Sequence, residues 1–278
     1  MISMISLNVN NFGGNTGKPL PGDYRDGDAF DWEAWSGAVY EWRQVNADVI
    51  MKNARSIVNL VRDYDVIFLH EVDVNSKSWR YLLSELGKEY RYEVPNGYDK
   101  ESYKHNLRTI TCAFIRKGID YTYGEENPFG RERSVQLNIK GVEIIEVHMD
   151  GGDSDNARKH WDRLREVSDS LKEQKALIIG DMNAYDKGTF RKDILEVMIN
   201  DFKYIDHWTK QGRSDDTATF SYGKRIDYAL ATQELYNESN PRQMILNYTI
   251  REHLSDHAAV KDNIFGFRTD HCSDPHNH

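Results

Sequence analysis

A carboxylate and a carboxamide stand two residues apart in the segment Gly180-Asp181-Met182-Asn183, directly after the apolar run 176–179. A short apolar run closed by a glycine predicts a buried strand. Residues two apart on a strand point to the same face, so Asp181 and Asn183 would reach one site. An anionic acceptor beside an amide that donates and accepts suits holding a water next to a metal-bound phosphate. Taken alone, the segment fits a strand-ending turn equally well.

Polar residues recur at the ends of other predicted strands. His70 and Glu71 follow one apolar run, Asn8 ends another, Asp227 lies in an alternating segment, and Ser255-Asp256-His257 precede a further run. Polar residues at strand ends collect at one edge of a sheet, where sites form. Together the segments offer four carboxylates with amides and histidine but no thiolate, which is the donor chemistry that hard divalent cations such as Mg²⁺ prefer.

Taken in chain order, these segments resemble the endonuclease/exonuclease/phosphatase superfamily. The matching segments span the chain from Ile2 to about Val260; they are Ser6–Asn10, His70–Val72, His148, Gly180–Asn183, Arg225–Tyr228 and Ser255–His257. The deoxyribonuclease I-like branch is the most similar, since the segments 7–13, 102–104, 130–132 and 147–155 also resemble it. The resemblance implies an α/β fold, a four-layer sandwich of two mostly antiparallel sheets flanked by helices.

The resemblance also implies a role for each residue of the set. Three residues are expected to hold the metal: Glu71 directly, with Asn8 and Asp256 in support. The implied ion is Mg²⁺, with Mn²⁺ also supporting activity and Ca²⁺ as an optional structural ion. Five residues are expected to be catalytic: Asp181 acting on the attacking water, Asn183 holding the phosphate or that water, His257 acting on the phosphate, Asp227 orienting His257, and His148. Asn10, Tyr103 and Arg131 are expected to bind phosphate or substrate, with Arg133 as the alternative to Arg131.

Two positions depart from the deoxyribonuclease I-like branch. There, the histidine matching His148 pairs with a glutamate after a Ser-Tyr-Lys segment, but this chain continues with His105-Asn106 and has no glutamate. Asp73 stands where that branch has a DNA-contacting arginine, and an acid would repel a duplex phosphate. The catalytic residues therefore match the branch more closely than the duplex-binding residues do.

The elements that must position these residues are predicted from hydrophobic spacing. Helices are expected at 33–63, 76–86, 155–174 and 190–200, the second capped by Ser76 and stopped by Gly87. Strands are expected at 2–8, 65–69, 91–94, 109–116, 119–123, 133–138, 142–148, 176–180, 218–221, 226–231, 244–249 and 257–261. This alternation favours two packed sheets flanked by helices in one catalytic domain, 1–265, followed by a tail, 266–278.

The segment 11–48 holds three of the six tryptophans, among them Trp32 and Trp35, together with Arg25. Two interpretations remain open. The aromatic side chains cover the core, as aromatic residues often do. Alternatively, they form a wall on which a base or sugar of the substrate stacks.

Composition places the chain among soluble globular proteins, with 39% hydrophobic and 29% charged residues. The net charge of −9 argues against tight, salt-driven binding to nucleic acid. The two cysteines, Cys112 and Cys272, form no disulfide or zinc motif, and no signal peptide or membrane-spanning run is evident. We therefore expect a cytoplasmic protein, monomeric and without a membrane partner.

Three classes of function compete. The leading hypothesis is a divalent-metal-dependent phosphodiesterase acting on nucleic acid, a DNA endonuclease of low sequence specificity. The second is a phosphatase or phospholipase C-type hydrolase acting on phosphoinositide or sphingomyelin, because the same core serves both. The third is a non-catalytic binding module, which would be expected to lose site carboxylates that this chain retains. Fold alone does not separate these classes.

Overall fold

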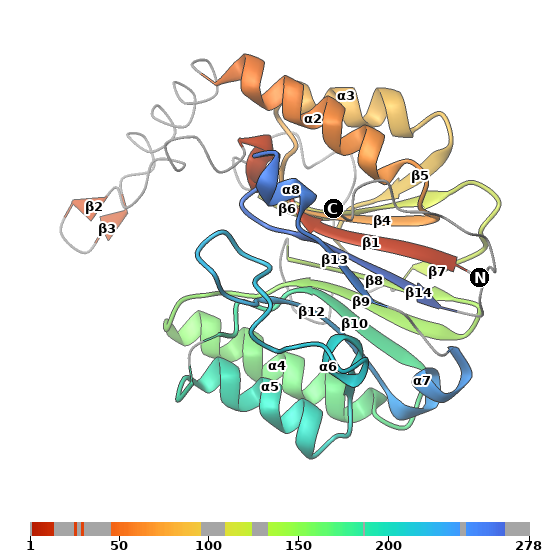
Figure 1. Cartoon of the computed structure of the whole chain (residues 1–278), viewed down its shortest axis with the longest axis vertical. Coiled ribbons are helices and arrows are strands. Elements are labelled where there is room, and N and C mark those ends of the chain that lie inside the picture. Colours follow the sequence, from red (N-terminus) through yellow and green to blue (C-terminus); the bar gives the residue numbers. More distant parts are fainter. Residues whose placement is uncertain are drawn as a thin grey trace.

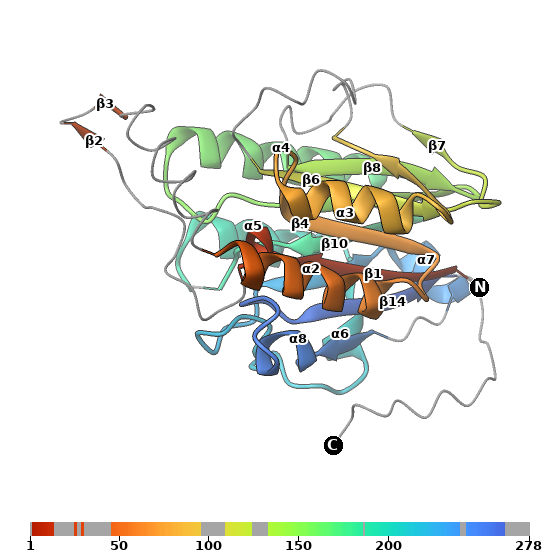
Figure 2. The same cartoon turned by 90° about the horizontal axis from the view of Figure 1, so that it is seen from above.

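The computed structural model describes residues 2–13, 25–26, 29–30, 46–95, 109–123, 133–185, 187–239 and 243–264. Figure 1 shows these residues in four layers, helices on the outside and two sheets packed face to face between them. Helices α2 (Ala47–Val61) and α3 (Lys77–Leu86) cover one sheet, and α4 (Asp155–Leu171) and α5 (Phe190–Asn200) cover the other. Figure 2 shows α2 and α3 lying along the strands beneath them. The predicted α/β sandwich is confirmed.

Each sheet has six strands in the same pattern of directions. The order is β13-β14-β1-β4-β6-β5 in the first sheet and β11-β12-β10-β9-β8-β7 in the second. The two central strands of each sheet are parallel, and every other neighbouring pair is antiparallel. The first sheet comprises β1 (Ile2–Asn8), β4 (Val66–Asp73), β5 (Tyr90–Glu93), β6 (Thr109–Arg116), β13 (Met244–Leu246) and β14 (Ala259–Ile264). The second comprises β7 (Thr122–Tyr123), β8 (Ser134–Ile139), β9 (Val142–His148), β10 (Ala176–Asp181), β11 (Ile205–Asp206) and β12 (Asp227–Ala231).

The parallel pairs bring the functional strand ends to one edge of the sandwich. Parallel strands need a crossover connection, which α2 supplies between β1 and β4 and α4 supplies between β9 and β10. The register then pairs Asn8 with His70 in the first sheet and Asp181 with His148 in the second. Antiparallel β12 starts beside the end of β10, with Asp227 opposite Asp181. Segments far apart in the sequence thus end side by side.

Three buried apolar clusters hold the layers together. One lies between α2, α3 and the first sheet and includes Phe12, Ile57 and Phe114. The second lies between the two sheets, and the third lies between the second sheet and α4 and α5, where Trp161 is fully buried. Burial of this apolar surface is the main favourable term in folding. The strands at the site edge are therefore fixed from both faces.

Several predicted boundaries shift. Ser76 caps α3 as predicted, and its hydroxyl accepts from the Trp79 amide. Strand β4 continues beyond the predicted 69 to Asp73, because Val72 and Asp73 still pair with β6. Helix α4 ends at Leu171, three residues early, and the strand expected at 218–221 is reduced to two isolated bridges of Phe220, with Lys224 and with His257. The strand expected at 244–249 stops at Leu246, and the short helix α8 (Tyr248–Arg251) replaces its end.

Other short elements were not predicted. They are η1 (Asn10–Phe12), α6 (His207–Lys210), α7 (Gln233–Ser239) and the paired strands β2 (Arg25–Asp26) and β3 (Ala29–Phe30), together with β11. The first half of the helix predicted at 33–63 lies outside the described residues, as do the tryptophans of 11–48 and the whole tail, 266–278. Cys112 is buried in β6, as expected for a strand interior, and Cys272 lies outside the described part. No helix in the described ranges is long and apolar enough to cross a bilayer.

Candidate active site

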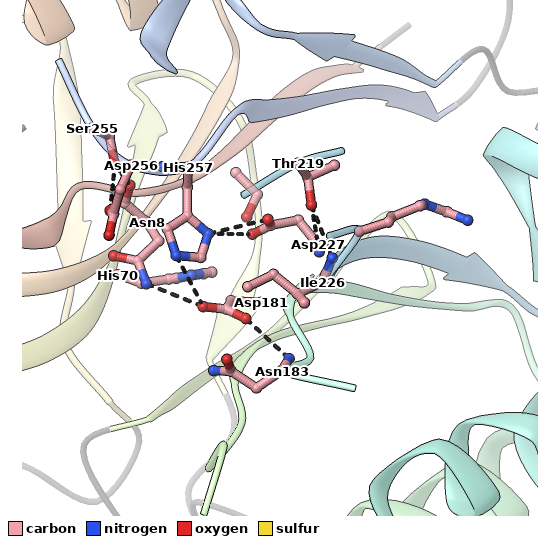
Figure 3. A network of polar contacts seen from close by, with 12 residues as sticks. Asn8, His70, Asp181, Asn183, Thr219, Ile226, Asp227, Ser255, Asp256 and His257 are labelled. Carbon is pink, nitrogen blue, oxygen red and sulfur yellow. Dashed lines mark hydrogen bonds and ion pairs between the residues drawn. The ribbon is translucent and has the colours of Figure 1, made fainter. Parts of the chain in front are cut away.

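Asp181 lies at the centre of the polar network at the end of β10. Its carboxylate accepts from the Asn183 amide at 3.0 Å through Oδ1 and from the Asn8 side-chain amide at 3.1 Å through Oδ2. Figure 3 shows these contacts converging on Asp181 from both sheets. Burial raises the pKa of this carboxyl to about 7; the charge of His257 opposes the shift and that of Asp227 adds to it. Asp181 is therefore poised to exchange a proton near neutral pH.

His257 and Asp227 form a buried pair beside Asp181. The imidazole Nδ1 lies 3.1 Å from Asp227 Oδ2, and Nε2 lies 3.7 Å from Asp181 Oδ2. Burial disfavours the charged imidazole, but the carboxylates of Asp227 and Asp181 outweigh it and raise the pKa of His257 to about 10. The Thr219 hydroxyl accepts from the Asp227 amide at 3.0 Å and fixes the start of β12. The imidazolium therefore presents its Nε2 proton toward Asp181.

Glu71 faces Asp181 from the first sheet. It has a positive φ of 54° at an irregularity in the pairing of β4 with β6, and this local kink turns its side chain toward the site. Glu71 Oε1 accepts from the Asn8 side-chain amide at 3.1 Å. Because the same amide also donates to Asp181, Asn8 holds the two carboxylates in a fixed relation across the sheets.

The loop before β14 adds a further carboxylate. The Ser255 hydroxyl donates to the Asn8 carbonyl at 2.6 Å and ties this loop to the end of β1. Burial, together with the charge of Glu71, raises the pKa of Asp256, while His257 and a hydrogen bond with Asn10 oppose the shift. The Asn10 backbone amide donates to Asn8 Oδ1 at 3.0 Å. Asn10 thus supports Asn8 and Asp256, and its contact with substrate stays a prediction.

His148 is a neutral imidazole at the junction of the sheets. Its Nε2 lies 3.4 Å from Glu71 Oε1 and 3.8 Å from Asp181 Oδ2. Burial, together with the charges of Arg133, His70 and His257, holds the pKa of His148 well below the ordinary value. A neutral ring 3.4 Å away forms no ion pair with Glu71, so the contact is at most a weak hydrogen bond.

A second layer beneath the site was not predicted. His70 Nε2 is hydrogen-bonded to Glu146 Oε1, which also accepts from the Ser6 hydroxyl at 2.8 Å, and all three residues are buried. Burial raises the pKa of Glu146, and Glu146 in turn raises that of His70 against the effect of burial, so the pair keeps the proton that joins it. The His70 ring stacks on His148 with centroids 5.7 Å apart.

Gly180 gives this layer its room. It has a φ of 134°, and a Cβ there would lie 2.1 Å from the Val147 carbonyl oxygen and 2.9 Å from Glu146 Oε1. The sequence signals for the layer are an acid, Glu146, two residues before His148 and directly after the apolar pair Ile144-Ile145, and a glycine directly before Asp181. Neither signal identifies its partner, because the two sheets meet only in the fold.

The residues present fit a divalent cation. Ligand atoms of Asp181, Asp227 and His257 lie within 4.8 Å of one another, so this buried group could hold a metal ion. A protonated His257 offers no lone pair, however, and its pKa of about 10 disfavours that role. The raised pKa values of Asp181 and Asp256 mark crowded, buried carboxyl groups that a cation would stabilise in ionised form.

Most of the residues predicted for the site lie in the described part of the structure, and the interpretation of Asp73 changes. Eight of them lie together at one edge: Asn8, Asp181, Asn183, Asp227, Asp256 and His257, which Figure 3 labels, together with Glu71 and His148. Tyr103 and Arg131 lie outside the described residues. Asn183, with φ 50°, donates from its side chain to the Met149 carbonyl at 2.9 Å. Asp73 is buried, and its carboxylate accepts from the Asn75 amide at 3.0 Å in the turn before α3. Asp73 thus stabilises a turn and is not an exposed acid facing a duplex.

The fold and this site define a class of protein. The Endonuclease/Exonuclease/phosphatase family matches residues 5–257, and the chain belongs to this family, whose members are hydrolytic enzymes. The match confirms the resemblance drawn from the sequence motifs. No curated protein matches the chain.

Solved structures share the fold at low sequence identity. A variant of the 3′ phosphatase NExo from Neisseria, bound to a product DNA hairpin, is similar with a TM-score of 0.62 and 16% identity, covering 96% of this chain and 100% of that one. The 3′-5′ exonuclease NExo from Neisseria meningitidis gives 0.61 and 15%, covering 95% and 100%. The endonuclease domain of TRAS1, a telomere-specific non-LTR retrotransposon, gives 0.56 and 11%, covering 96% and 100%. At these identities the likeness establishes the deoxyribonuclease I-like fold.

Proposed function

We propose that the protein is a divalent-metal-dependent phosphodiester hydrolase acting on nucleic acid, a DNA endonuclease of low sequence specificity. The observation that carries the proposal is the convergence of Asp181, the His257–Asp227 pair and Glu71 at one edge of the sandwich, joined through the Asn8 amide. The set combines a group that can accept a proton, a cation that can neutralise phosphate, and carboxylates that can hold a metal.

Each residue has a role consistent with its surroundings. Asp181, with a pKa of about 7, orients the attacking water and accepts its proton. The charged His257 donates from Nε2 to a phosphate oxygen, and Asp227 fixes the ring orientation through Nδ1. Asn183, next to Asp181 on the turn after β10, holds the phosphate or that water. His148, neutral and within reach of Glu71, supplies a hydrogen bond rather than a charge.

Glu71 would hold the metal, with Asp256 and Asn8 supporting it directly or through water. We propose Mg²⁺, because these donors are all oxygens and Mg²⁺ keeps several of its waters. When bound, the ion would neutralise and polarise the scissile phosphate, which is worth several kcal/mol of transition-state stabilisation. Burial and the charge of Glu71 raise the pKa of Asp256, so the two carboxyl groups are close enough to serve one cation.

Nucleic acid as the substrate is supported by the structural neighbours. One is described as bound to a product DNA hairpin and another as an endonuclease domain. Contacts to phosphate carry no direct sequence information, and the site residues described above are all of the kind that contact phosphate. We therefore propose cleavage with little sequence preference. The same group of residues would serve a phosphatase, so the substrate panel must distinguish internal cleavage from release of a terminal phosphate.

A substrate panel tests the proposal. Plasmid DNA, single-stranded DNA, RNA, a 3′-phosphorylated oligonucleotide and sphingomyelin or phosphoinositide vesicles would be incubated with and without Mg²⁺ or Mn²⁺. The Asp181→Asn variant, purified in the same way, controls for contaminating nucleases. We expect metal-dependent nicking of plasmid DNA, cleavage ends spread over many sequences, and loss of both in the variant. Release of phosphate from the 3′-phosphorylated or lipid substrates without internal cleavage would contradict the endonuclease proposal.

A further inference from the structure

A tight turn, 219–224, is joined to the catalytic loop by backbone hydrogen bonds. The Ser221 amide donates to the Asp256 carbonyl at 2.8 Å, and the Ala258 amide donates to the Thr219 carbonyl at 2.7 Å. The turn closes on itself at Gly223, which has φ 78° and donates to the Phe220 carbonyl at 2.9 Å. Figure 3 shows where the turn begins, at Thr219 beside Asp227. The turn is therefore positioned by the same segment that carries Asp256 and His257.

A series of aromatic rings leads from the reacting centre along this turn. The rings of His257 and Phe220 have centroids 4.9 Å apart, and those of Phe220 and Tyr222 have centroids 5.1 Å apart. Tyr222 lies at the outer end and is 80% exposed, against 40% for Val49, the other exposed large hydrophobic residue of the described part. Phe220 supports the Tyr222 ring, so the exposed ring has a defined place beside the site.

The reach of this series matches the repeat of a nucleic-acid strand. Stacked bases rise about 3.4 Å per step along one strand, so two ring contacts span roughly one to three steps. The turn also carries a basic group: Lys224 Nζ lies 3.7 Å from the centre of the ring of Tyr185, which follows Asn183 by two residues. A phosphate held at Asp181 and His257 thus places a neighbouring base of its strand within reach of Tyr222.

We infer that Tyr222 is a stacking platform for a nucleobase that flanks the scissile phosphate. The inference rests on the proposed function and specifies its substrate, a strand with at least one unpaired or splayed base beside the reacting phosphate. Stacking on an aromatic ring tolerates any base, because every base has a π-face. The platform therefore strengthens binding without introducing sequence preference. Tyr222 touches the substrate base and takes no part in bond cleavage.

The expected effect of removing the ring follows from the energy of one stack. Base–aromatic stacking contributes about 1–3 kcal/mol per base. At about 1.4 kcal/mol per tenfold, this converts to a loss of about 5-fold to 140-fold in affinity. The loss should appear in KM and in the dissociation constant rather than in kcat, since the groups around Asp181 are unchanged.

The test compares two ligands of equal charge. One is a short, fluorescently labelled thymidine oligonucleotide, and the other is a sugar–phosphate chain of the same length made of abasic units. Fluorescence anisotropy gives both dissociation constants for the wild type, Tyr222→Ala, Tyr222→Leu and Tyr222→Trp. Tyr222→Leu keeps apolar bulk but has no π-face, and Val49→Ala is the matched control for loss of an exposed apolar side chain elsewhere.

We expect Tyr222→Ala and Tyr222→Leu to weaken binding of the thymidine oligonucleotide about 5-fold to 140-fold. Binding of the abasic chain should not change, and Tyr222→Trp should bind thymidine at least as well as the wild type. Equal affinity of Tyr222→Ala and wild type for the thymidine oligonucleotide would overturn the inference. An equal loss on both ligands would also overturn it, since it would indicate a disturbed turn.

Hydrolysis of bis(p-nitrophenyl) phosphate separates this inference from the proposed function. Wild-type protein that hydrolyses neither this diester nor nucleic acid in Mn²⁺ refutes the proposed function. The anisotropy measurement still decides on stacking, because it requires no cleavage. If the wild type is active but Tyr222→Ala changes the affinity for the thymidine oligonucleotide no more than that for the abasic chain, the stacking platform alone is refuted.

Discussion

Replacing Asp227 by Asn removes the charge beside His257 and keeps a side chain of nearly the same shape. Asp227 is the largest of the influences that raise the pKa of His257 to about 10, working against burial. Each pKa unit is worth about 1.36 kcal/mol, so the rise from the ordinary 6.5 corresponds to about 5 kcal/mol of preference for the charged ring. Without Asp227, burial is opposed only by Asp181 and Asp256, and we expect the pKa of His257 to fall toward its ordinary value.

The consequence for activity depends on pH. At about pH 8, His257 is charged in the wild type, whereas in Asp227→Asn its imidazole would be largely neutral. We therefore expect the variant to lose roughly a hundredfold or more in rate at this pH. Lowering the pH to about 6 should restore part of that loss, because the imidazole regains its proton. Rates would be measured from about pH 5.5 to 9.5 on a labelled oligonucleotide and on bis(p-nitrophenyl) phosphate, with the His257 ring followed by nitrogen NMR.

The two substrates distinguish the role of the proton. A larger loss on the oligonucleotide, which has the poorer leaving group, indicates that His257 protonates the leaving oxygen; equal losses indicate neutralisation of the phosphate. Stability provides a second readout, since a folded pKa raised above 6.5 contributes stability that is present below pH 6.5 and is lost as the pH rises through about 10. Parallel pH–rate profiles for wild type and Asp227→Asn would refute the reasoning.

Three further outcomes are expected. Glu71→Gln should lower turnover by roughly a hundredfold or more with an unchanged circular dichroism spectrum, since a metal site supplies several kcal/mol to the transition state; near-normal turnover would remove Glu71 from the site. Gly180→Ala should lower the free energy of unfolding by about 3 kcal/mol or more, because its Cβ would meet the Val147 carbonyl at 2.1 Å, whereas Gly188→Ala, with positive φ but open space, should cost about 1 kcal/mol; equal urea midpoints would contradict this. Affinity for Mn²⁺ should rise with pH up to about pH 7, with proton release measured by calorimetry, because ionisation of Asp181, whose pKa is about 7, adds negative charge beside the ion that Glu71 holds; a pH-independent affinity over this range would contradict that coupling.

The sequence predicts the elements well where hydrophobic spacing is regular. The apolar run before Asp181 and the cap at Ser76 fix β10 and α3 almost to the residue. The turn at 219–224 overlaps the strand predicted at 218–221, because Thr and Phe favour strands, but Gly223 at φ 78° closes the turn after an isolated bridge. Local propensity is outweighed there by the need to pair with the segment 256–258.

Single residues of the site were predictable, but their partners were not. Each strand-end acid or amide is visible in the sequence, and the superfamily resemblance supplied their grouping. The His70–Glu146 pair has no such guide, since the sequence presents His70 as a strand-end group and Glu146 as one polar residue in a strand. Both face the space between the sheets, and that face is defined only when the parallel pairs of each sheet form. The positive φ of Glu71 likewise arises from the irregular pairing of β4 with β6.

The central claim, metal-dependent hydrolysis of nucleic acid at this site, is tested most directly by removing and restoring the ion. Wild-type protein and the Glu71→Gln variant would be stripped with EDTA, and cleavage of a labelled DNA would be followed as Mg²⁺ or Mn²⁺ is added back. We expect no cleavage in EDTA, recovery with either ion in the wild type, and no comparable recovery in the variant. Full cleavage by the wild type in excess EDTA would contradict it.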